Sequence, residues 1–240
     1  MRTALFSSGE GLAYWKLTKA RIVAYADRMG ADFIDLPERP GDNPQWVFFD
    51  AIRESIERDY QRAAWIDADI VVGSFAHNIL DERYGHRFMV CEPQTPRRVH
   101  PKWRQAVSSG KWGVPNMRPY PITAVAAWSP GLHTPMSRLV DWFDENYDRF
   151  PRSEGSKRSW WGDQELLALG IWETDMAFHF FPTGMHSMKR YLPPADSMGV
   201  EMAHPAGGNK LAKIREMLEL MKGWERRRAT PSSPFQKNRE

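Results

Sequence analysis

The sequence predicts an α/β fold: a mostly parallel, twisted sheet with helices on both faces, in a single domain. Short apolar runs alternate with segments whose apolar residues recur at helical spacing, which is the pattern of strand-helix-strand units. The chain has 240 residues, close to the upper size of one domain. Its 42% hydrophobic and 26% charged residues are typical of a globular protein.

The first part of the chain supplies most of the expected sheet. Strand, helix, strand, helix and strand are expected in that order over residues 2–6, 14–29, 32–36, 45–58 and 63–66. Gly30 ends the first helix, and a loop rich in proline and glycine precedes the second. The third strand ends in Asp67-Ala68-Asp69 and is followed by the apolar run IVV. Ligands of such sheets bind at the carboxyl ends of the strands, where this aspartate pair lies.

The later elements follow a long irregular segment. Residues 93–121 contain six prolines and are expected to form a loop. Thr134 is expected to cap a helix that Pro135 opens. Two strands and three helices are expected beyond the loop, in the order strand, helix, helix, strand and amphipathic helix, over residues 122–128, 134–147, 162–170, 199–204 and from 209 onward.

The net charge of +3 is concentrated at the C-terminus. Residues 222–240 contain six basic and two acidic residues, so the rest of the chain sums to −1 and does not predict nucleic-acid binding. The last residues are also rich in proline and serine. We therefore expect a domain over residues 1–222 and a flexible basic tail over residues 223–240.

A second charge asymmetry lies within the domain. Residues 93–140 contain no acidic residue and seven basic ones: Arg97, Arg98, Lys102, Arg104, Lys111, Arg118 and Arg138. Two interpretations stay open. The stretch is either a surface that faces an anionic partner or a solvated region balanced by acids elsewhere in the fold.

Several classes of protein are excluded by what the chain lacks. No run approaches the roughly 18 apolar residues of a membrane span. The first residues do not form a secretory signal, so a cytoplasmic location is expected. Cys91 is the single cysteine, which excludes disulfide frameworks and cysteine zinc sites.

The Asp67-Ala68-Asp69 triplet is the first candidate site. Two carboxylates between apolar runs place charge at a largely buried sheet edge, where unpaired carboxylates are costly. A divalent cation would remove that cost, and oxygen ligands suit Mn²⁺ or Mg²⁺. The alternative is that the pair caps a turn or pairs with an arginine.

A second motif, His204-x-x-Gly207-x-x-Lys210, is more specific. The composition predicts roughly 0.02 such patterns by chance. The histidine ends an expected strand and can supply a metal ligand, the glycine lets the backbone approach a phosphate, and the lysine lies in the first turn of a helix, where anions are favoured.

With these motifs the chain resembles the metal-dependent glycosyltransferases of the GT-A fold, especially the glycogenin and bacterial galactosyltransferase-like group. The matching segments are WIDADIVV, GDQELL and HPAGGNK. The resemblance implies that Asp67, Asp69 and His204 hold Mn²⁺ or Mg²⁺ against the diphosphate of a nucleotide sugar. It also implies that Gly207 and Lys210 contact the phosphates.

Further donor contacts are expected around these motifs. The resemblance implies a basic donor contact at Arg53 and an acidic and amide pair beside the donor sugar at Asp163 and Gln164, of which Asp163 is nearest the reacting carbon. We also assign Phe6, Ser7 and Tyr14, from the end of the first strand to the start of the first helix, to donor binding. Tryptophan faces can stack on sugars, so Trp103, Trp112, Trp160 and Trp161 are acceptor candidates, whereas Trp15, Trp65 and Trp142 are expected in the core.

The motifs and this resemblance thus predict a hexosyltransferase that uses a nucleotide-sugar donor, with a UDP-sugar favoured. Retention of the anomeric configuration is implied by the resemblance alone. The acceptor is an unidentified hydroxyl, and the anion-facing interpretation of residues 93–140 predicts an anionic glycan or an acidic protein surface. A sugar nucleotidyltransferase is an alternative, but the loop SSGEGLAYWK lacks the early arginine of its phosphate loop. A non-enzymatic carbohydrate or anion-binding protein is another, and it leaves Asp67, Asp69 and His204 unexplained.

Overall fold

The centre of the fold is a six-stranded sheet in the order β2-β1-β3-β6-β5-β7. Its strands are β1 (Thr3–Ser7), β2 (Asp32–Asp35), β3 (Arg62–Ile66), β5 (Met89–Cys91), β6 (Ile122–Trp128) and β7 (His179–Phe180). Only β6 runs against the others, since it pairs antiparallel with both β3 and β5 while the remaining pairs are parallel. The mostly parallel sheet predicted from the sequence is therefore confirmed.

This structure is a computed structural model, and it describes part of the chain. The described residues are 2–38, 44–84, 87–91, 121–129, 133–149, 163–182, 185–188, 192–194, 196–205 and 209–230. Most of the acid-free stretch and the four tryptophans proposed as acceptor candidates lie outside them, as does Gly207. Among the described residues, none of the helices has the length and apolar character that crossing a membrane requires.

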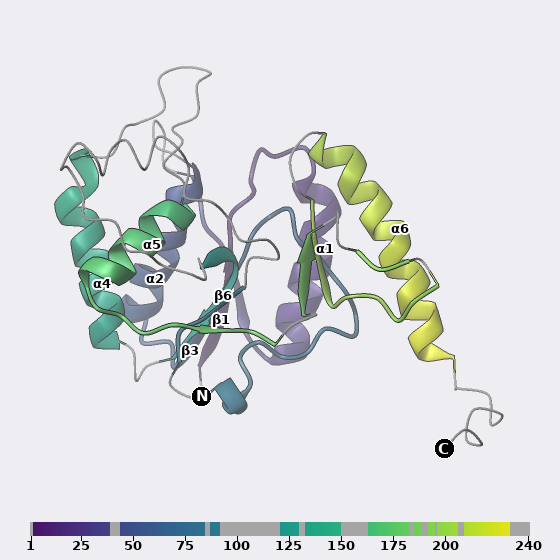
Figure 1. The fold of residues 1–240 in the computed structure, drawn as a ribbon, viewed down its shortest axis with the longest axis horizontal. Helices are drawn as coiled ribbons and strands as arrows, with labels where there is room; N and C mark the ends of the chain where they lie inside the picture. Colours follow the sequence, from purple (N-terminus) through teal and green to yellow (C-terminus); the bar gives the residue numbers. More distant parts are fainter. Residues whose placement is uncertain are drawn as a thin grey trace.

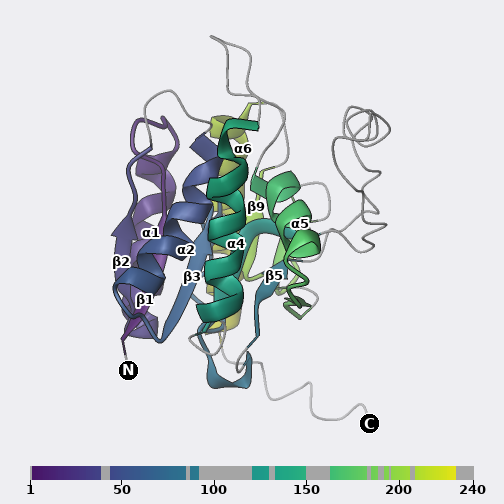
Figure 2. The ribbon, with the colours of Figure 1, turned by 90° about the vertical axis from the view of Figure 1, so that its left-hand side faces the viewer.

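Helices cover both faces of the sheet. They are α1 (Trp15–Met29), α2 (Val47–Glu57), α4 (His133–Asn146), α5 (Asp163–Glu173) and α6 (Lys210–Ala229), with short 3₁₀ turns at Pro44–Trp46, Glu82–Tyr84 and Tyr147–Arg149. Figure 1 shows α2, α4 and α5 on one side of the central strands, and α1 and then α6 on the other. Figure 2 views the molecule from the α4 side, with α2 and α4 in front of the strands. Helix α4 begins at His133, so Thr134 lies inside it and is not its cap.

Alternating side chains of the strands feed two apolar clusters. Ala4 and Phe6 of β1 belong to the cluster under α2, α4 and α5, whereas Leu5 between them belongs to the cluster under α1. In the first cluster, the rings of Phe49 and Phe143 stack with centroids 4.2 Å apart. Trp65 also lies in this cluster, and Trp15 in the second, as predicted. Trp142 packs against the first cluster while partly buried.

A second sheet of three strands lies between α1 and α6. It consists of β4 (Val71–Val72), β9 (Met202–His204) and β8 (His186–Met188), in the order β4-β9-β8. The apolar run after Asp69 thus enters this small sheet, where Val71 pairs with Ala203. Helix α6 covers it with a buried row of apolar side chains: Ile214, Met217, Met221 and Trp224.

Helix α6 corrects the predicted boundary of the tail. It continues through Ala229, so residues 223–229 are helical and not a flexible tail. Trp224 is fully buried there, and Glu225 forms an ion pair with Arg21 of α1. The buried tryptophan and the ion pair explain why the domain extends past residue 222. Residues 231–240 lie outside the described residues.

Candidate functional site

The carboxyl end of β3 places the two aspartates. Asp67 follows the strand directly, and its backbone N–H donates to Ala124 O of β6 at 2.9 Å. The N–H of Ile70 donates back to Asp67 O at 3.0 Å, which closes a turn around Ala68 and Asp69. The predicted position of the pair, at the end of a sheet strand, is confirmed by this geometry.

His204 reaches the same place from the end of β9. Its Nε2 lies 3.3 Å from Asp69 Oδ1, which is close enough for an ion pair. The two groups are not aligned for a hydrogen bond. Ligand atoms of Asp67, Asp69 and His204 all lie within 4.8 Å of one another. His204, which is 135 positions after Asp69 in the sequence, is thus brought together with the two aspartates. We call these three residues the Asp-Asp-His cluster.

Lys210 completes the cluster from the first turn of α6. Its Nζ forms a short ion pair with Asp69 Oδ2 and lies 5.7 Å from the centre of the Tyr14 ring. Asn209 caps this helix, since its side chain accepts a hydrogen bond from Ala212 N at 3.1 Å. The N-terminus of α6 therefore lies beside the Asp-Asp-His cluster, as the motif predicts.

The charges of the cluster shift the protonation of its members in opposite directions. Burial alone would raise the pKa of Asp69, but the charges of His204 and Lys210 outweigh burial and hold that pKa well below its usual range. Burial, and then the nearby charge of Asp69, raise the pKa of Asp67. Burial opposes the charged form of His204 and of Lys210, yet Asp69 raises both of their pKa values.

The donor set fits a divalent cation. Asp69 Oδ1 and His204 Nδ1 are buried and have no hydrogen-bond partner among the described residues. Two carboxylates and an imidazole are a ligand set that Mn²⁺ accepts, and they leave coordination places for phosphate oxygens and water. A cation there would also relieve the repulsion between the two aspartates.

Two neighbouring side chains that the sequence did not assign to the site lie against the cluster. Trp65 of β3 donates its indole N–H to Asp67 Oδ1 at 2.7 Å. His186 of β8 is buried, with its ring centre 5.4 Å from that of His204. Burial, and then the charge of His204, lower the pKa of His186 to about 3. Trp65 could have been found from the sequence, because residues two apart along a strand lie on the same face and Trp65 comes two residues before Asp67. Nothing in the sequence points to His186.

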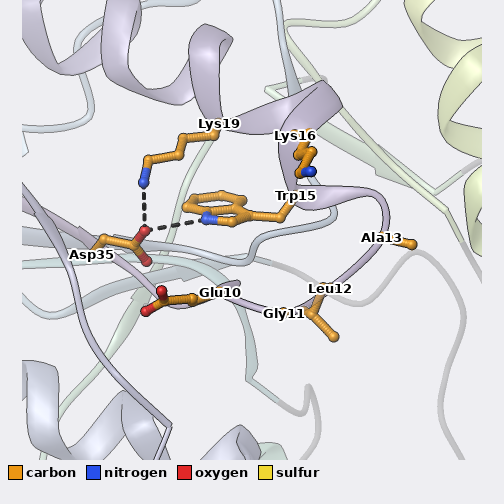
Figure 3. A pocket seen from close by; sticks show the side chains of 8 residues that line it. All are labelled: Glu10, Gly11, Leu12, Ala13, Trp15, Lys16, Lys19 and Asp35. Atoms are coloured by element: carbon orange, nitrogen blue, oxygen red, sulfur yellow. Dashed lines mark hydrogen bonds and ion pairs between the residues drawn. The ribbon is translucent and has the colours of Figure 1, made fainter.

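A cleft opens beside the cluster, at the ends of β1 and β2. It has a volume of about 580 Å³ and is lined by residues of the loop after β1, the start of α1 and the end of β2: Glu10, Gly11, Leu12, Ala13, Trp15, Lys16, Lys19 and Asp35. Figure 3 shows Asp35 facing both the Trp15 indole and Lys19. Asp35 Oδ2 accepts from Trp15 Nε1 at 3.1 Å and from Lys19 Nζ at 2.7 Å. Asp35 Oδ1 is buried without a hydrogen-bond partner among the described residues.

Gly9 brings this loop against the aspartate turn. A Cβ at this position would lie 2.5 Å from the Trp15 ring and 2.8 Å from the Ala68 side chain. Thr18 of α1 strengthens the same contact, since its hydroxyl donates to Ala68 O at 2.5 Å. The close approach makes the cleft and the Asp-Asp-His cluster neighbours along one edge of the sheet.

The structure does not bring every predicted residue to the cluster. Phe6 and Ser7 are completely buried, and the Ser7 hydroxyl donates to Ile66 O at 2.7 Å. Neither side chain is therefore accessible to a nucleotide-sugar donor. Arg53 forms ion pairs with Asp50 and Asp144 between α2 and α4, and these carboxylates occupy its guanidinium.

The remaining predicted residues are placed as follows. Tyr14 immediately precedes α1 and lies near Lys210. Asp163 and Gln164 begin α5, and Gln164 is partly buried. The side chain of Asp163 and all of Gly207 lie outside what the structure describes.

The fold is shared with solved glycosyltransferases. A glycosyltransferase involved in the glycosylation of the major capsid of PBCV-1 matches with a TM-score of 0.55 and 12% identity, over 91% of this chain and 100% of that chain. Mouse xyloside xylosyltransferase 1, in its apo form, matches with a TM-score of 0.51 and 14% identity, over 87% and 98%. The predicted GT-A fold is confirmed.

The comparisons establish the fold and leave the family open. No protein-family model matches the chain, and no curated protein sequence matches it. At 12% and 14% identity the likeness concerns the arrangement of the elements, not the chemistry of individual residues. The resemblance to the glycogenin group therefore stays a prediction.

Proposed function

We propose that this protein is a glycosyltransferase that moves a hexose from a nucleotide-diphosphate sugar to a hydroxyl acceptor, with Mn²⁺ or Mg²⁺ bound at the Asp-Asp-His cluster. One observation carries the proposal. Asp67, Asp69 and His204 converge within 4.8 Å at the carboxyl end of β3, on a fold that two glycosyltransferases share. A UDP-sugar is the favoured donor.

The donor would lie across the cleft and the cluster. Asp35 lines the cleft, and its carboxylate can accept a hydrogen bond from a base N–H or a ribose hydroxyl. The diphosphate would lie at the N-terminus of α6, where free N–H groups and Lys210 favour an anion. Gly207 would let the backbone approach the phosphates.

The chemistry follows from stabilising the leaving group. A bound cation would offset the negative charge that develops on the diphosphate as the bond to the sugar breaks. Asp67, Asp69 and His204 would hold it, and Lys210 would add a positive charge on the same phosphates. We assign Asp163 to the reacting carbon and Gln164 to the orientation of the sugar, with the anomeric configuration retained.

The acceptor is proposed to be anionic, either an acidic glycan or an acidic protein surface. The acid-free stretch of residues 93–140 supports this, because its seven basic residues lie in chain order between the aspartate pair and Asp163. Arg138, on α4, is the one of these that the described residues include.

Titration calorimetry with UDP tests the proposed function. UDP should bind much more tightly in Mn²⁺ than in EDTA, since the diphosphate and the cluster share the cation. A second titration with uridine, which lacks phosphates, should show the same affinity in both buffers. Equal UDP affinity with and without Mn²⁺ would remove the cation from the site and contradict the proposal.

A further inference from the structure

Trp65 touches the cluster through a single directed hydrogen bond. Its indole N–H donates to Asp67 Oδ1 at 2.7 Å, and the side chain is only 4% exposed. Its position is fixed by packing, because its ring meets that of Phe48 edge to face with centroids 5.9 Å apart. The indole N–H of Trp65 therefore cannot turn away from Asp67 without disturbing the first apolar cluster.

We propose that Trp65 is a positioning residue for the metal site: its indole N–H holds Oδ1 of Asp67, so that Oδ2 is the oxygen offered to the cation. This role rests on the proposed function. A carboxylate with one oxygen held has fewer orientations to lose when it becomes a ligand. Hydrogen bonds to a metal ligand from a residue that does not itself bind the metal orient that ligand and tune the metal affinity of the site.

The charges of the cluster explain why a hydrogen-bond donor beside Asp67 favours its ionised form. Asp67 and Asp69 repel each other, and the ion pair with Lys210 is made by Asp69. Asp67 receives the indole N–H instead, and a donor to the ionised carboxylate favours that form. The two aspartates thus have different partners, a lysine for one and a tryptophan for the other.

Trp128 offers a matched control on the neighbouring strand. It lies in the same apolar cluster, is 3% exposed and meets Phe48 with centroids 6.2 Å apart. Its indole N–H donates at 2.8 Å to Ser55 Oγ of α2, away from the Asp-Asp-His cluster. The two tryptophans share burial and packing but differ in what their N–H holds.

The experiment compares Trp65→Phe with Trp128→Phe. Phenylalanine keeps an aromatic ring and removes the N–H, so both variants should lose similar stability in thermal melts. Mn²⁺ binding, measured by electron paramagnetic resonance at saturating UDP, should weaken about 10- to 100-fold in Trp65→Phe and stay unchanged in Trp128→Phe. Unchanged Mn²⁺ affinity in folded Trp65→Phe would overturn the role of Trp65. If the unaltered protein bound no Mn²⁺, the proposed function itself would fall, and this role with it.

A measurement on the unaltered protein does not depend on how the variants fold. Addition of Mg²⁺ and UDP should shift the indole ¹H–¹⁵N resonance of Trp65, because the charge of its acceptor carboxylate becomes shared with the cation. The indole resonance of Trp128 should move much less. A Trp65 resonance that stays in place while the complex forms would overturn the proposal.

Discussion

Both faces of the central sheet pack on an apolar cluster, but polar contacts contribute differently to the two. Under α2, α4 and α5 the contacts are mostly apolar, with aromatic rings packed edge to face and the stacked pair Phe49 and Phe143. On the other face, directed polar contacts join α1, the small sheet and α6. Arg21 pairs with Glu225, and His77 pairs with Glu201.

The candidate site lies on the side with directed contacts. Apolar burial is non-directional, whereas hydrogen bonds and ion pairs require a particular distance and angle. Lys210 and His204 approach Asp69 because α6 and β9 are held in place against α1 and β4. The comparison indicates a division: apolar packing under α2, α4 and α5 chiefly supplies stability, whereas the α1 side combines its own apolar clusters with the polar contacts that place Lys210 and His204. Three variants test that division, in order of decreasing expected effect.

Phe49→Ala should damage stability and spare the site. The side chain is fully buried against Phe143, so its removal should lower the free energy of unfolding by about 3–5 kcal/mol. Urea unfolding measures this loss. UDP affinity in Mn²⁺, measured well below the melting temperature, should be unchanged. A matched variant on the same layer, Trp172→Ala, should cost little because Trp172 is 51% exposed. Strongly weakened UDP binding in folded Phe49→Ala would break the division.

Asp69→Asn should have the opposite profile. The change keeps the size of the side chain but removes the charge that faces His204 and Lys210. Turnover of the donor, followed by nucleotide release, should fall at least about 100-fold, equivalent to about 2.7 kcal/mol. Circular dichroism should still show the folded protein, and Asp81→Asn, which changes a half-exposed carboxyl away from the cluster, should retain full turnover. Near-normal turnover in Asp69→Asn would favour the alternative that the aspartates cap a turn.

Glu225→Gln should give the smallest effect and a characteristic pH dependence. Burial opposes the charged form of Glu225, but the hydrogen bonds from Arg21 and Ser74 hold its pKa below the usual range. A lowered folded pKa means that the pair stabilises the fold above the unfolded pKa of about 4.3, and that this stabilisation is lost as pH falls through the folded pKa. Since the pair is partly exposed, the variant should be about 1 kcal/mol less stable at pH 7.

The difference between the unaltered protein and Glu225→Gln should close as the pH is lowered below about 4. Urea unfolding across the pH range measures it. Glu219→Gln is the matched control on the same helix, because its exposed pair with Lys222 should leave the free energy of unfolding unchanged within error. A Glu225→Gln difference that is constant with pH would show that the loss comes from packing and not from charge.

Much of the fold was predictable because its signals are local. The helix over 14–29 ends at Gly30, which adopts a left-handed φ of 64°, and the helix from residue 209 begins at the capping residue Asn209. Asp67, Asp69 and His204 were predicted together because each follows or ends an apolar run. The likeness to a known motif then connected them across the chain.

The features that were missed depend on contacts between distant residues. The strands β7, β8 and β4 have only two or three residues each, too few for a periodic pattern. Arg53 has the predicted charge and lies at the predicted distance before the aspartate pair, but it forms an ion pair with Asp144 of α4. The spacing along the sequence does not reveal that Asp144 lies beside it. The cleft was missed because Asp35 gains its partners only when β2 lies beside α1.

The contact between Asp69 and Lys210 spans 141 residues, and this has a consequence for synthesis. A ribosome adds about 5–20 residues per second, so the two carboxylates are made roughly 7–30 seconds before their lysine. During that interval the nascent chain can form the first three strands of its central sheet, while Asp69 lacks its ion-pair partner Lys210. The last helix of the described residues therefore supplies the lysine that pairs with a carboxylate made much earlier.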